Sequence, residues 1–364
     1  MALPLSRADF CRLSLSGLLG AAACKPNAEA RPNPAAPPQP ATAAATPAAA
    51  SSSAQRQPEG VPKRKLGSTG EEVSMLGLGG AHIGDADKVT DDEATWLMHA
   101  AIDGGITFFD NCWDYNGGKS EERMGKALQG GHRHRVFLMT KLDGRTAKAA
   151  TAQLEQSLKR LQTDVIDLVQ VHEVIRMTDP ARSFAPDGII GALQAAKKAG
   201  KLRFIGFTGH KDPAIHLAML EAARKAGFAF DTVQMPLNVM DAHYKSFEVN
   251  VLPVLQDQGI GVLGMKSMGS GDILKSGLVK PEECLRYALS LPTSVVITGI
   301  DSRAVLEQDL KLARSFVPLS GEERARLLAR TADAAANGQH ELFKTANKYD
   351  GTAKHPKWLE GAEI

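Results

Sequence analysis

The chain has 364 residues, which is enough for one large domain or two modest ones. Its 43 basic and 41 acidic side chains nearly cancel, so nothing in the composition favours a nucleic-acid partner or an electrostatic membrane patch. The four cysteines form no Cys-x-x-Cys pair, which argues against a metal site built on paired cysteines, and no apolar run is long enough to span a bilayer.

The N-terminal residues have the composition of a targeting segment. Arg7 and Arg12 precede the apolar run LSLSGLLGAAAC, so we predict an export signal over residues 1–24, either twin-arginine-like or lipoprotein-like. Residues 25–60 are rich in Pro and Ala and predict a disordered linker, because they hold almost no large apolar side chain. We therefore expect an exported protein that is periplasmic or tethered to a membrane through Cys24, with a cytoplasmic protein as the alternative.

From residue 61 the sequence alternates between apolar runs and helical patterns. KLGSTGEEVSMLGLGG predicts two short strands around a Ser-Thr-Gly turn. Counting LGLGG as the first barrel strand gives eight strand–helix pairs, and the near-continuously apolar strands indicate burial on both faces. This pattern predicts a TIM (β/α)8 barrel over residues 61–320 with an N-terminal β-hairpin, followed by an extra C-terminal helix and tail over residues 321–364. The later strands are expected at TFFDNC, VFLMTKL, VIDLVQVHE, LRFIGFTG, TVQMPLN, GVLGMKSM and SVVITGI.

An open, doubly wound sheet is the alternative fold for the same alternation. It is disfavoured because no Gly-x-Gly-x-x-Gly stands between a strand and a helix with a ribose-binding acid downstream. Within the barrel, Gly117 and Gly118 predict a sharp turn, and Ser120 is the expected N-cap of the helix SEERMGKALQG.

Proton-active side chains stand where consecutive strands end. Asp110 ends the second strand with Tyr115 in the loop after it, Lys141 ends the third, and His172 ends the fourth. Each residue alone has an ordinary explanation, such as turn capping, packing or contact with water. Because active sites of such barrels lie at the carboxyl ends of the strands, the four together favour a site of general acid–base chemistry.

The chain resembles the aldo/keto reductase family from about Lys63 to Phe316. The resemblance rests on RKLGSTGEEVSMLGLGG, GITFFDNCWDYNGGKSEERMGKAL, MTKL, DVIDLVQVHE, IGFTGH, VQMPLN, GMKSMGSG and ITGIDS. It implies a reductase that moves hydride between NAD(P)H and an aldehyde or ketone, a sugar among the candidates.

The resemblance also implies the roles of the four residues. Tyr115 would donate the proton to the carbonyl oxygen, and Lys141 would lower the pKa of its phenol. Asp110 would pair with the lysine, and His172 would donate a hydrogen bond to the oxygen. Cys112 lies close by in the sequence and is interpreted as packing.

The nucleotide contacts implied by the resemblance depart from the family pattern in several places. Gly209 stands where Asn is frequent, and Met265 stands where an aromatic residue usually stacks on the nicotinamide. Arg303 favours NADP(H) over NAD(H), because a guanidinium would bind a 2′-phosphate, whereas Asp301 argues for a free ribose hydroxyl. The cofactor-binding candidates are Gly80, Thr208, Gly209, Gln234, Met265, Lys266, Gly299, Arg303, Gln308 and Asp309, the last two at the adenine end.

For the substrate pocket the candidates are His82 and Trp113, the latter with a core position as its equal alternative. The expected partner is a small carbonyl compound, with no nucleic acid and no metal, and the oligomeric state is open. A cofactor-binding regulatory or accessory subunit on the same barrel is the competing function. A metal-dependent hydrolase is weaker, since His and carboxylate ligands do not cluster at the strand ends.

Overall fold

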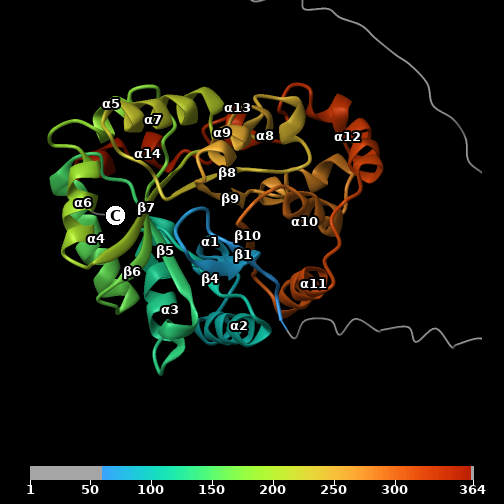
Figure 1. The fold of residues 1–364 in the computed structure, drawn as a ribbon. Coiled ribbons are helices and arrows are strands. Elements are labelled where there is room, and N and C mark those ends of the chain that lie inside the picture. Colours follow the sequence, from blue (N-terminus) through green and yellow to red (C-terminus); the bar gives the residue numbers. More distant parts are fainter. Residues whose placement is uncertain (1–59, 362–364) are drawn as a thin grey trace, which may run out of the picture. The chain divides into compact units, whose positions relative to one another are not determined.

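The computed structural model describes residues 60–361. Eight parallel strands form a closed barrel in the order β10-β3-β4-β5-β6-β7-β8-β9. Helices surround this ring in Figure 1. The expected TIM barrel is confirmed, whereas the predicted signal at residues 1–24 and nearly all of the predicted linker at 25–60 lie outside the described residues.

The strands follow the predicted apolar runs. A hairpin of β1 (Lys63–Lys65) and β2 (Glu72–Ser74) precedes the barrel and pairs antiparallel, as expected. The barrel strands are β3 (Leu76–Gly79), β4 (Phe108–Asp110), β5 (Phe137–Leu142), β6 (Ile166–Val171), β7 (Leu202–Thr208), β8 (Thr232–Pro236), β9 (Gly261–Met265) and β10 (Val295–Gly299).

Most of the longer helices begin at a capping residue that the sequence shows. Thr90, Thr146, Asp212 and Ser302 each accept a hydrogen bond from a backbone N–H of the first turn. The longer helices are α2 (Asp91–Gly104), α3 (Lys119–Ala127), α4 (Ala147–Leu161), α6 (Ile189–Lys198), α7 (Pro213–Lys225), α10 (Pro281–Ser290), α11 (Arg303–Arg314) and α12 (Gly321–Ala335).

Short helices occupy the connections between these elements. They are α1 (Gly80–Ile83), α5 (Asp179–Ser183), α8 (Phe247–Asn250), α9 (Leu252–Asp257), α13 (Leu342–Thr345) and α14 (Gly351–Lys354). The 3₁₀ turns are η1 (Tyr115–Gly118), η2 (His132–Arg135), η3 (Asp241–His243), η4 (Gly269–Gly271), η5 (Leu274–Ser276) and η6 (Pro356–Glu360). Among residues 60–361, no helix has the length and apolar character to cross a membrane.

The predicted N-cap at Ser120 is wrong. Helix α3 begins at Lys119 with Gly118 as its N-cap, in the left-handed region at φ 85°. The Ser120 hydroxyl instead donates to the backbone oxygen of Gly80 at 2.7 Å and ties the helix to the end of β3. Gly117 and Gly118 do make the sharp turn, since both have positive φ.

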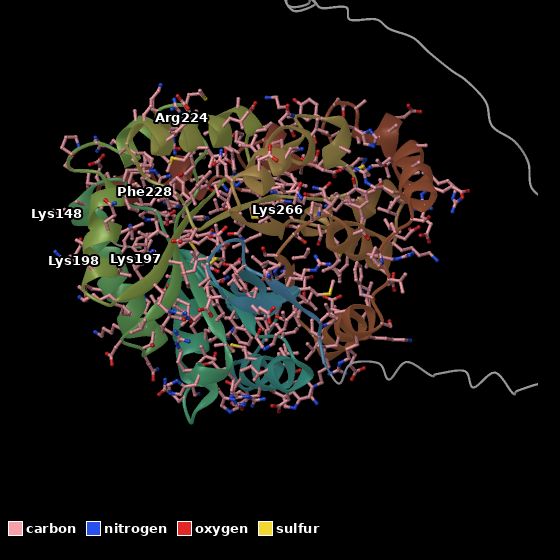
Figure 2. All side chains as sticks on the ribbon, in the orientation of Figure 1. Lys148, Lys197, Lys198, Arg224, Phe228 and Lys266 are labelled. Atoms are coloured by element: carbon pink, nitrogen blue, oxygen red, sulfur yellow. The ribbon has the colours of Figure 1, made fainter. Side chains whose placement is uncertain are left out.

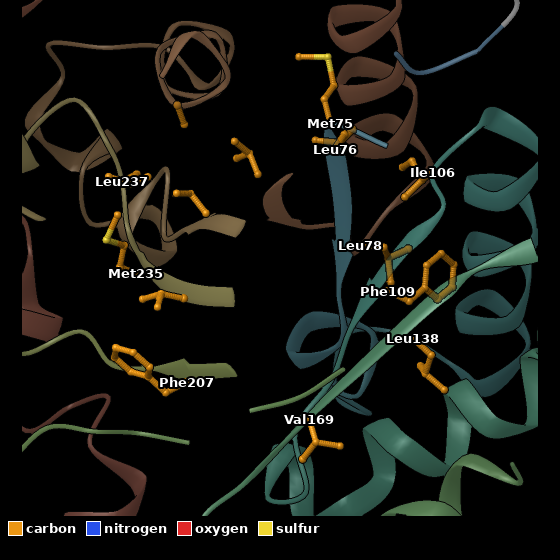
Figure 3. Close-up of a cluster of buried hydrophobic side chains, with 14 of the residues drawn as sticks. Met75, Leu76, Leu78, Ile106, Phe109, Leu138, Val169, Phe207, Met235 and Leu237 are labelled. Atoms are coloured by element: carbon orange, nitrogen blue, oxygen red, sulfur yellow. The ribbon is translucent and has the colours of Figure 1, made fainter. Parts of the chain in front are cut away.

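Alternation along each strand separates two apolar clusters. Phe109, Leu138 and Val169 belong to the larger one, which also contains helix residues, so they face outward (Figure 3). Phe108 and Met139 belong to the other, which holds only residues of the strands and of the hairpin and its turn, so they face the barrel interior. Two residues beyond Phe108 and Met139 come Asp110 and Lys141, and the same alternation turns both side chains inward at the carboxyl end of the barrel.

The ring pair inside the barrel gives a test of this arrangement. Phe108 is fully buried and stacks on Phe137 with ring centroids 5.3 Å apart. We expect Phe108→Ala to lower the free energy of unfolding by about 3–5 kcal/mol, because it opens a cavity in the interior cluster. Val317→Ala, at a 64% exposed position, should change it by less than about 0.5 kcal/mol. Equal urea midpoints for the two variants would contradict the assignment of Phe108 to the core.

Candidate active site

Lys141 lies at the centre of a hydrogen-bonded group at the carboxyl end of the barrel. Its Nζ pairs with the Asp110 carboxylate, donates to the backbone oxygen of Asn111 at 2.7 Å, and lies 3.1 Å from the Tyr115 hydroxyl oxygen. The side chains of Lys141 and Asp110 are buried. Three of the four predicted catalytic residues are therefore in direct contact.

Burial and charge act in opposite directions on this group. Burial raises the pKa of the Tyr115 phenol, and the positive charge of Lys141 opposes that rise without cancelling it. Burial alone would lower the pKa of Lys141, but the negative charge of Asp110 and its hydrogen bond with the lysine outweigh burial and the pKa is raised. The expected effect of the lysine on the phenol has the right sign, yet burial is larger, so Tyr115 holds its proton and Lys141 its charge.

His172, directly after β6, joins this group from the other side of Tyr115. The two rings meet edge to face with centroids 6.1 Å apart. The histidine Nδ1 lies 2.8 Å from Asp143 Oδ1 and 3.2 Å from Cys112 Sγ. Burial lowers the pKa of His172 in spite of the nearby Asp114, so the ring is neutral at neutral pH. All four predicted residues are thus brought together at one end of the barrel.

Cys112 is fully buried, and burial raises the pKa of its thiol well above the ordinary value. This environment disfavours the thiolate and agrees with packing rather than nucleophilic chemistry.

Gln234 on β8 extends the group along the rim. Its Nε2 donates to Asp110 Oδ2 at 3.1 Å, so one carboxylate holds both a lysine and an amide. Its buried Oε1 meets no hydrogen-bond donor among the described residues. A buried carbonyl oxygen without a donor indicates that a ligand group supplies one.

A cavity of about 500 Å³ begins at this group and runs across the strand ends from β4 to α11. It connects the catalytic rim at Asp110 and Tyr115 with the start of α11. The predicted cofactor and substrate residues that line it are His82, Gln234, Met265, Lys266, Gly299, Gln308 and Asp309, and Asp301 lies among them. A Cβ atom at position 299 would come within 2.3 Å of His82 Nδ1, so glycine is needed there for the two segments to approach.

Five predicted cofactor and substrate residues do not line this cavity, and neither do the predicted catalytic residues Lys141 and His172. Gly80 packs against Ser120, and Thr208 is buried beside Gln234 in the strand register. Gly209 lies so close to the backbone of Val174 that no side chain would fit.

The other two, Trp113 and Arg303, have partners elsewhere. The Trp113 indole is 1% exposed and donates to Gln156 at 2.6 Å, so it is a core tryptophan and not the cavity wall that was expected as one alternative. Arg303 makes two 3.0 Å hydrogen bonds to the Glu93 carboxylate and lies over the Trp96 ring. Arg303 is thus paired with Glu93 and does not line the cavity, and its contact with a nucleotide stays a prediction.

Lys266 is the cation that faces the cavity from the end of β9. In Figure 2 it lies near the middle of the ring of helices, whereas Lys197 and Arg224 lie on the outer helices. Its Nζ is 4.8 Å from the centroid of the Tyr349 ring, and burial lowers its pKa to about 8. Lys266 and Ser270 both have left-handed backbone at φ 56°, the kind of strain that gathers at ligand sites.

The C-terminal segment from Glu341 to Thr352 contributes side chains that sequence reasoning missed. Asp350 lies 3.0 Å from His210 Nε2 and 2.8 Å from Lys211 Nζ. Glu173, next to His172 and at φ 58°, accepts hydrogen bonds from the backbone of Gly351 and from both the backbone and hydroxyl of Thr352. Glu173 and Asp143 were visible beside predicted residues in VQVHE and TKLDGR, whereas Asp350 lies in a stretch without any periodic pattern.

These observations fit a nicotinamide nucleotide. The cavity is long, and Gln234 Oε1 at one end and Asp309 at the other lack protein partners. Lys266 and residues of the strained turn at η4 also line the cavity, where a cation suits phosphate. Gln234 would hold the amide end, Lys266 and residues 267–271 the phosphates, and Gln308 with Asp309 the adenine end.

The comparisons with known proteins agree on one class. A model of the aldo/keto reductase family matches residues 75–278. The uncharacterized oxidoreductase YrpG of Bacillus subtilis (strain 168) is 32% identical over 227 residues, 57% of this chain and 66% of that protein. The L-galactose dehydrogenase of Arabidopsis thaliana is 29% identical over 232 residues, 59% of this chain and 67% of that protein.

A solved structure shows the same fold. The aldo-keto reductase AKR11C1 from Bacillus halodurans, in its holo form, superposes with a TM-score of 0.63 at 24% identity. The superposition covers 77% of this chain and 99% of that one.

The closed barrel is the fold of the aldo-keto reductase structure, and the relatives that match the chain include oxidoreductases. The chain belongs to the aldo/keto reductase family. Dependence on NAD(P)H is general in this family, and the comparisons do not separate NADP from NAD.

One expectation is corrected by the same comparisons. They support an oxidoreductase, an aldo/keto reductase and a TIM barrel, and they show no signal peptide. The signal peptide is therefore withdrawn as a feature of the chain, and the location of the protein stays a prediction.

Asp309 at the far end of the cavity gives a pH-dependent prediction. Its side chain is fully buried, and neither carboxylate oxygen has a hydrogen-bond donor in good geometry, although Thr298 and Gln308 are adjacent. Burial raises its pKa from 3.8 to about 6. Because this folded-state pKa lies above the unfolded one, the native fold loses stability as pH rises from about 4 to 6, by roughly 3 kcal/mol at most.

Asp309→Asn should remove this loss. We expect the variant to unfold at higher urea concentration than the parent at about pH 7.5 and at a similar concentration at about pH 4, where the native acid is protonated. Asp333→Asn, at an exposed position on α12, is the control and should change neither midpoint. A uniform shift at both pH values would show that ionisation of Asp309 is not the cause.

Proposed function

We propose that the chain is an NAD(P)H-dependent reductase of aldehydes or ketones. The observation that carries the proposal is the contact of the Tyr115 hydroxyl, at the cavity wall, with a buried Lys141 that Asp110 holds in place. A phenol within 3.1 Å of an ammonium is arranged to give up its proton to a ligand oxygen in the cavity.

Each of the four residues has a task in this chemistry. The nicotinamide, when bound, supplies the hydride. Tyr115 donates its proton to the carbonyl oxygen, and the Lys141 ammonium stabilises the phenolate that remains. Asp110 keeps the lysine charged and oriented in a buried site. His172 donates a hydrogen bond to the same oxygen as negative charge develops there.

We extend the proposal to hydroxylated carbonyl compounds, including sugars. The cavity lining includes His82, Lys88 and Lys266, side chains that hydrogen-bond hydroxyl groups. The relative from Arabidopsis thaliana is a dehydrogenase of L-galactose, which supports a sugar as substrate class.

For the nucleotide, the arrangement around Arg303 favours acceptance of NADH. Glu93 is already hydrogen-bonded to the guanidinium, whereas Asp301 lines the cavity, as does Lys88, which is paired with Asp85. A carboxylate repels a 2′-phosphate and accepts a hydrogen bond from a ribose hydroxyl. We therefore propose that NADH binds at least as tightly as NADPH.

The catalytic proposal is tested by Tyr115→Phe. We expect kcat for a panel of aldoses and simple aldehydes to fall at least about 100-fold, because general acid catalysis contributes that much. The dissociation constant of the nucleotide, measured by its fluorescence, should change little, since the phenol is needed only where the oxygen takes a proton.

Tyr244→Phe is the matched control for Tyr115→Phe. It removes a phenolic hydroxyl outside the cavity lining and should keep parental kcat. Undiminished turnover in Tyr115→Phe would exclude this tyrosine as the proton donor.

The nucleotide proposal is tested by Arg303→Met. Because Arg303 is paired with Glu93, its loss should change the dissociation constant of NADPH by less than about threefold, well under the 1.4 kcal/mol of a tenfold change. Asp301→Asn should tighten NADPH and leave NADH nearly unchanged or weaker. If Arg303→Met weakens NADPH more than about tenfold without affecting NADH, the guanidinium does bind a 2′-phosphate and the preference is reversed.

A further inference from the structure

Asp143 is a buried acid in direct contact with His172, and it has no role in the proposed proton transfer from Tyr115. Its side chain has no exposed surface, and its Oδ1 lies 2.8 Å from His172 Nδ1. Its Oδ2 is buried and meets no hydrogen-bond donor among the described residues. Asp143 therefore has one hydrogen-bond partner, the imidazole, and its protonation state decides how that ring is used.

The hydrogen between these two atoms can sit on either side. If Asp143 is a carboxylate, a neutral His172 must donate from Nδ1, and its Nε2 then carries only a lone pair. If Asp143 is protonated, its hydroxyl donates to Nδ1, and the hydrogen of the ring is on Nε2. Only the second arrangement gives the carbonyl oxygen of a substrate a hydrogen-bond donor from this histidine.

The surroundings of Asp143 favour the protonated acid. Arg145 is the nearest cation on its own loop, but its guanidinium donates to the backbone oxygens of Asp143, His172 and Glu173 and to the Asp179 side chain. No nitrogen of Arg145 donates to the Asp143 carboxyl group, so an ionised Asp143 would be buried without a compensating hydrogen bond from a cation.

The remaining charged and titratable neighbours add no donor to the carboxyl group. Lys141 donates hydrogen bonds from Nζ to Asp110, Asn111 and Tyr115, and none to Asp143. Negative charge approaches Asp143 from β6, from helix α3 and from the loop after β4. The titratable groups that face Asp143 are Lys141, Arg145, His172, Glu173, Glu121, Cys112 and Asp114.

Cys112 is the one competitor for the Nδ1 position. Its Sγ lies 3.2 Å from Nδ1, but a thiol is a weak donor, and the backbone oxygen of Lys141 is also within its reach at 3.6 Å. The Asp114 carboxylate is farther away, with Oδ1 at 3.8 Å from Nδ1. The shortest contact to the ring is thus the one from Asp143.

We propose that Asp143 is a positioning residue whose protonated carboxyl group donates to Nδ1 of His172, so that the Nε2 hydrogen faces the substrate oxygen. The proposal rests on the proposed carbonyl reduction for its kinetic consequence. Its structural content, the tautomer of one histidine, does not depend on turnover.

A pH dependence follows from this arrangement. Burial raises the pKa of Asp143 to about 8, and the neighbouring charge of Glu173 adds to the rise. Below that pH the acid is protonated and His172 keeps its Nε2 hydrogen. Above it the carboxylate draws the hydrogen to Nδ1, so kcat should fall as pH rises through about 8. Lys266 titrates in the same range, and a variant of Asp143 is needed to separate the two.

The tautomer is read directly by nitrogen-15 NMR of the histidine rings, with the signals of His172 identified by their loss in His172→Gln. We expect an Nε2-protonated ring at about pH 6.5 and a change toward the Nδ1-protonated ring above about pH 8. Asp143→Asn, whose amide can donate to Nδ1 at any pH, should keep the Nε2 hydrogen throughout. A ring protonated at Nδ1 at about pH 6.5 in the parent protein would overturn the proposal.

Kinetics with two substitutions separate positioning from packing. Asp143→Asn should keep kcat within about threefold and lose the basic limb of the pH profile, whereas Asp143→Leu should lower kcat about 100-fold, as expected for a lost donor to the oxyanion. The KM for the nucleotide should be unchanged in both. If kcat falls equally in the two variants, a carboxylate is required at this position. If both variants keep the parental kcat, Asp143 does not position the ring. Either result overturns the proposal.

Failure of the proposed function would look different. A parent protein that reduces no carbonyl compound with either nucleotide refutes the reductase but leaves the NMR titration intact. If Asp143→Leu does not fold, the parent and the isosteric Asp143→Asn still decide the question by their tautomers and pH profiles.

Discussion

A buried ammonium must have a negative partner, and the pairing of Lys141 with Asp110 is the interaction on which this site depends. The pair joins β4 to β5, and Gln234 adds β8 through the same carboxylate. Three strands of the barrel, two neighbouring and one separate from them, are thus linked by side chains at the rim near Tyr115. The closed barrel supplies the rigidity, since each of these strands also packs its outward side chains against helices.

Two acids a few ångströms from the catalytic tyrosine and histidine have opposite environments. Asp110 accepts hydrogen bonds from Lys141 and from Gln234. Asp143 has one partner and no hydrogen-bonded cation, which favours its neutral form. Two carboxyl groups with such different hydrogen-bond partners can have different roles within one site.

The barrel and the position of the catalytic residues at its rim could be predicted from the order of strands and helices in the sequence. The hydrogen-bond partners of individual side chains could not. Their positions at the ends of consecutive strands place Asp110 and Lys141 at the same edge of the barrel, and in the structure their side chains form an ion pair there. The position of Arg303 depends on Glu93, 210 residues earlier, which no local pattern reveals. In the same way, the buried indole of Trp113 donates a hydrogen bond to Gln156 on α4, a contact between residues far apart in the sequence.

The left-handed turn at Glu173 has a consequence for synthesis of the protein. Glu173 follows His172 directly, and its carboxylate is satisfied by Gly351 and Thr352, the latter 179 residues later in the chain. As the chain leaves the ribosome, β6 emerges long before this partner. The turn at Glu173 therefore gains these hydrogen bonds only after Thr352 has been synthesised, and termination before Thr352 would leave the turn next to His172 without them.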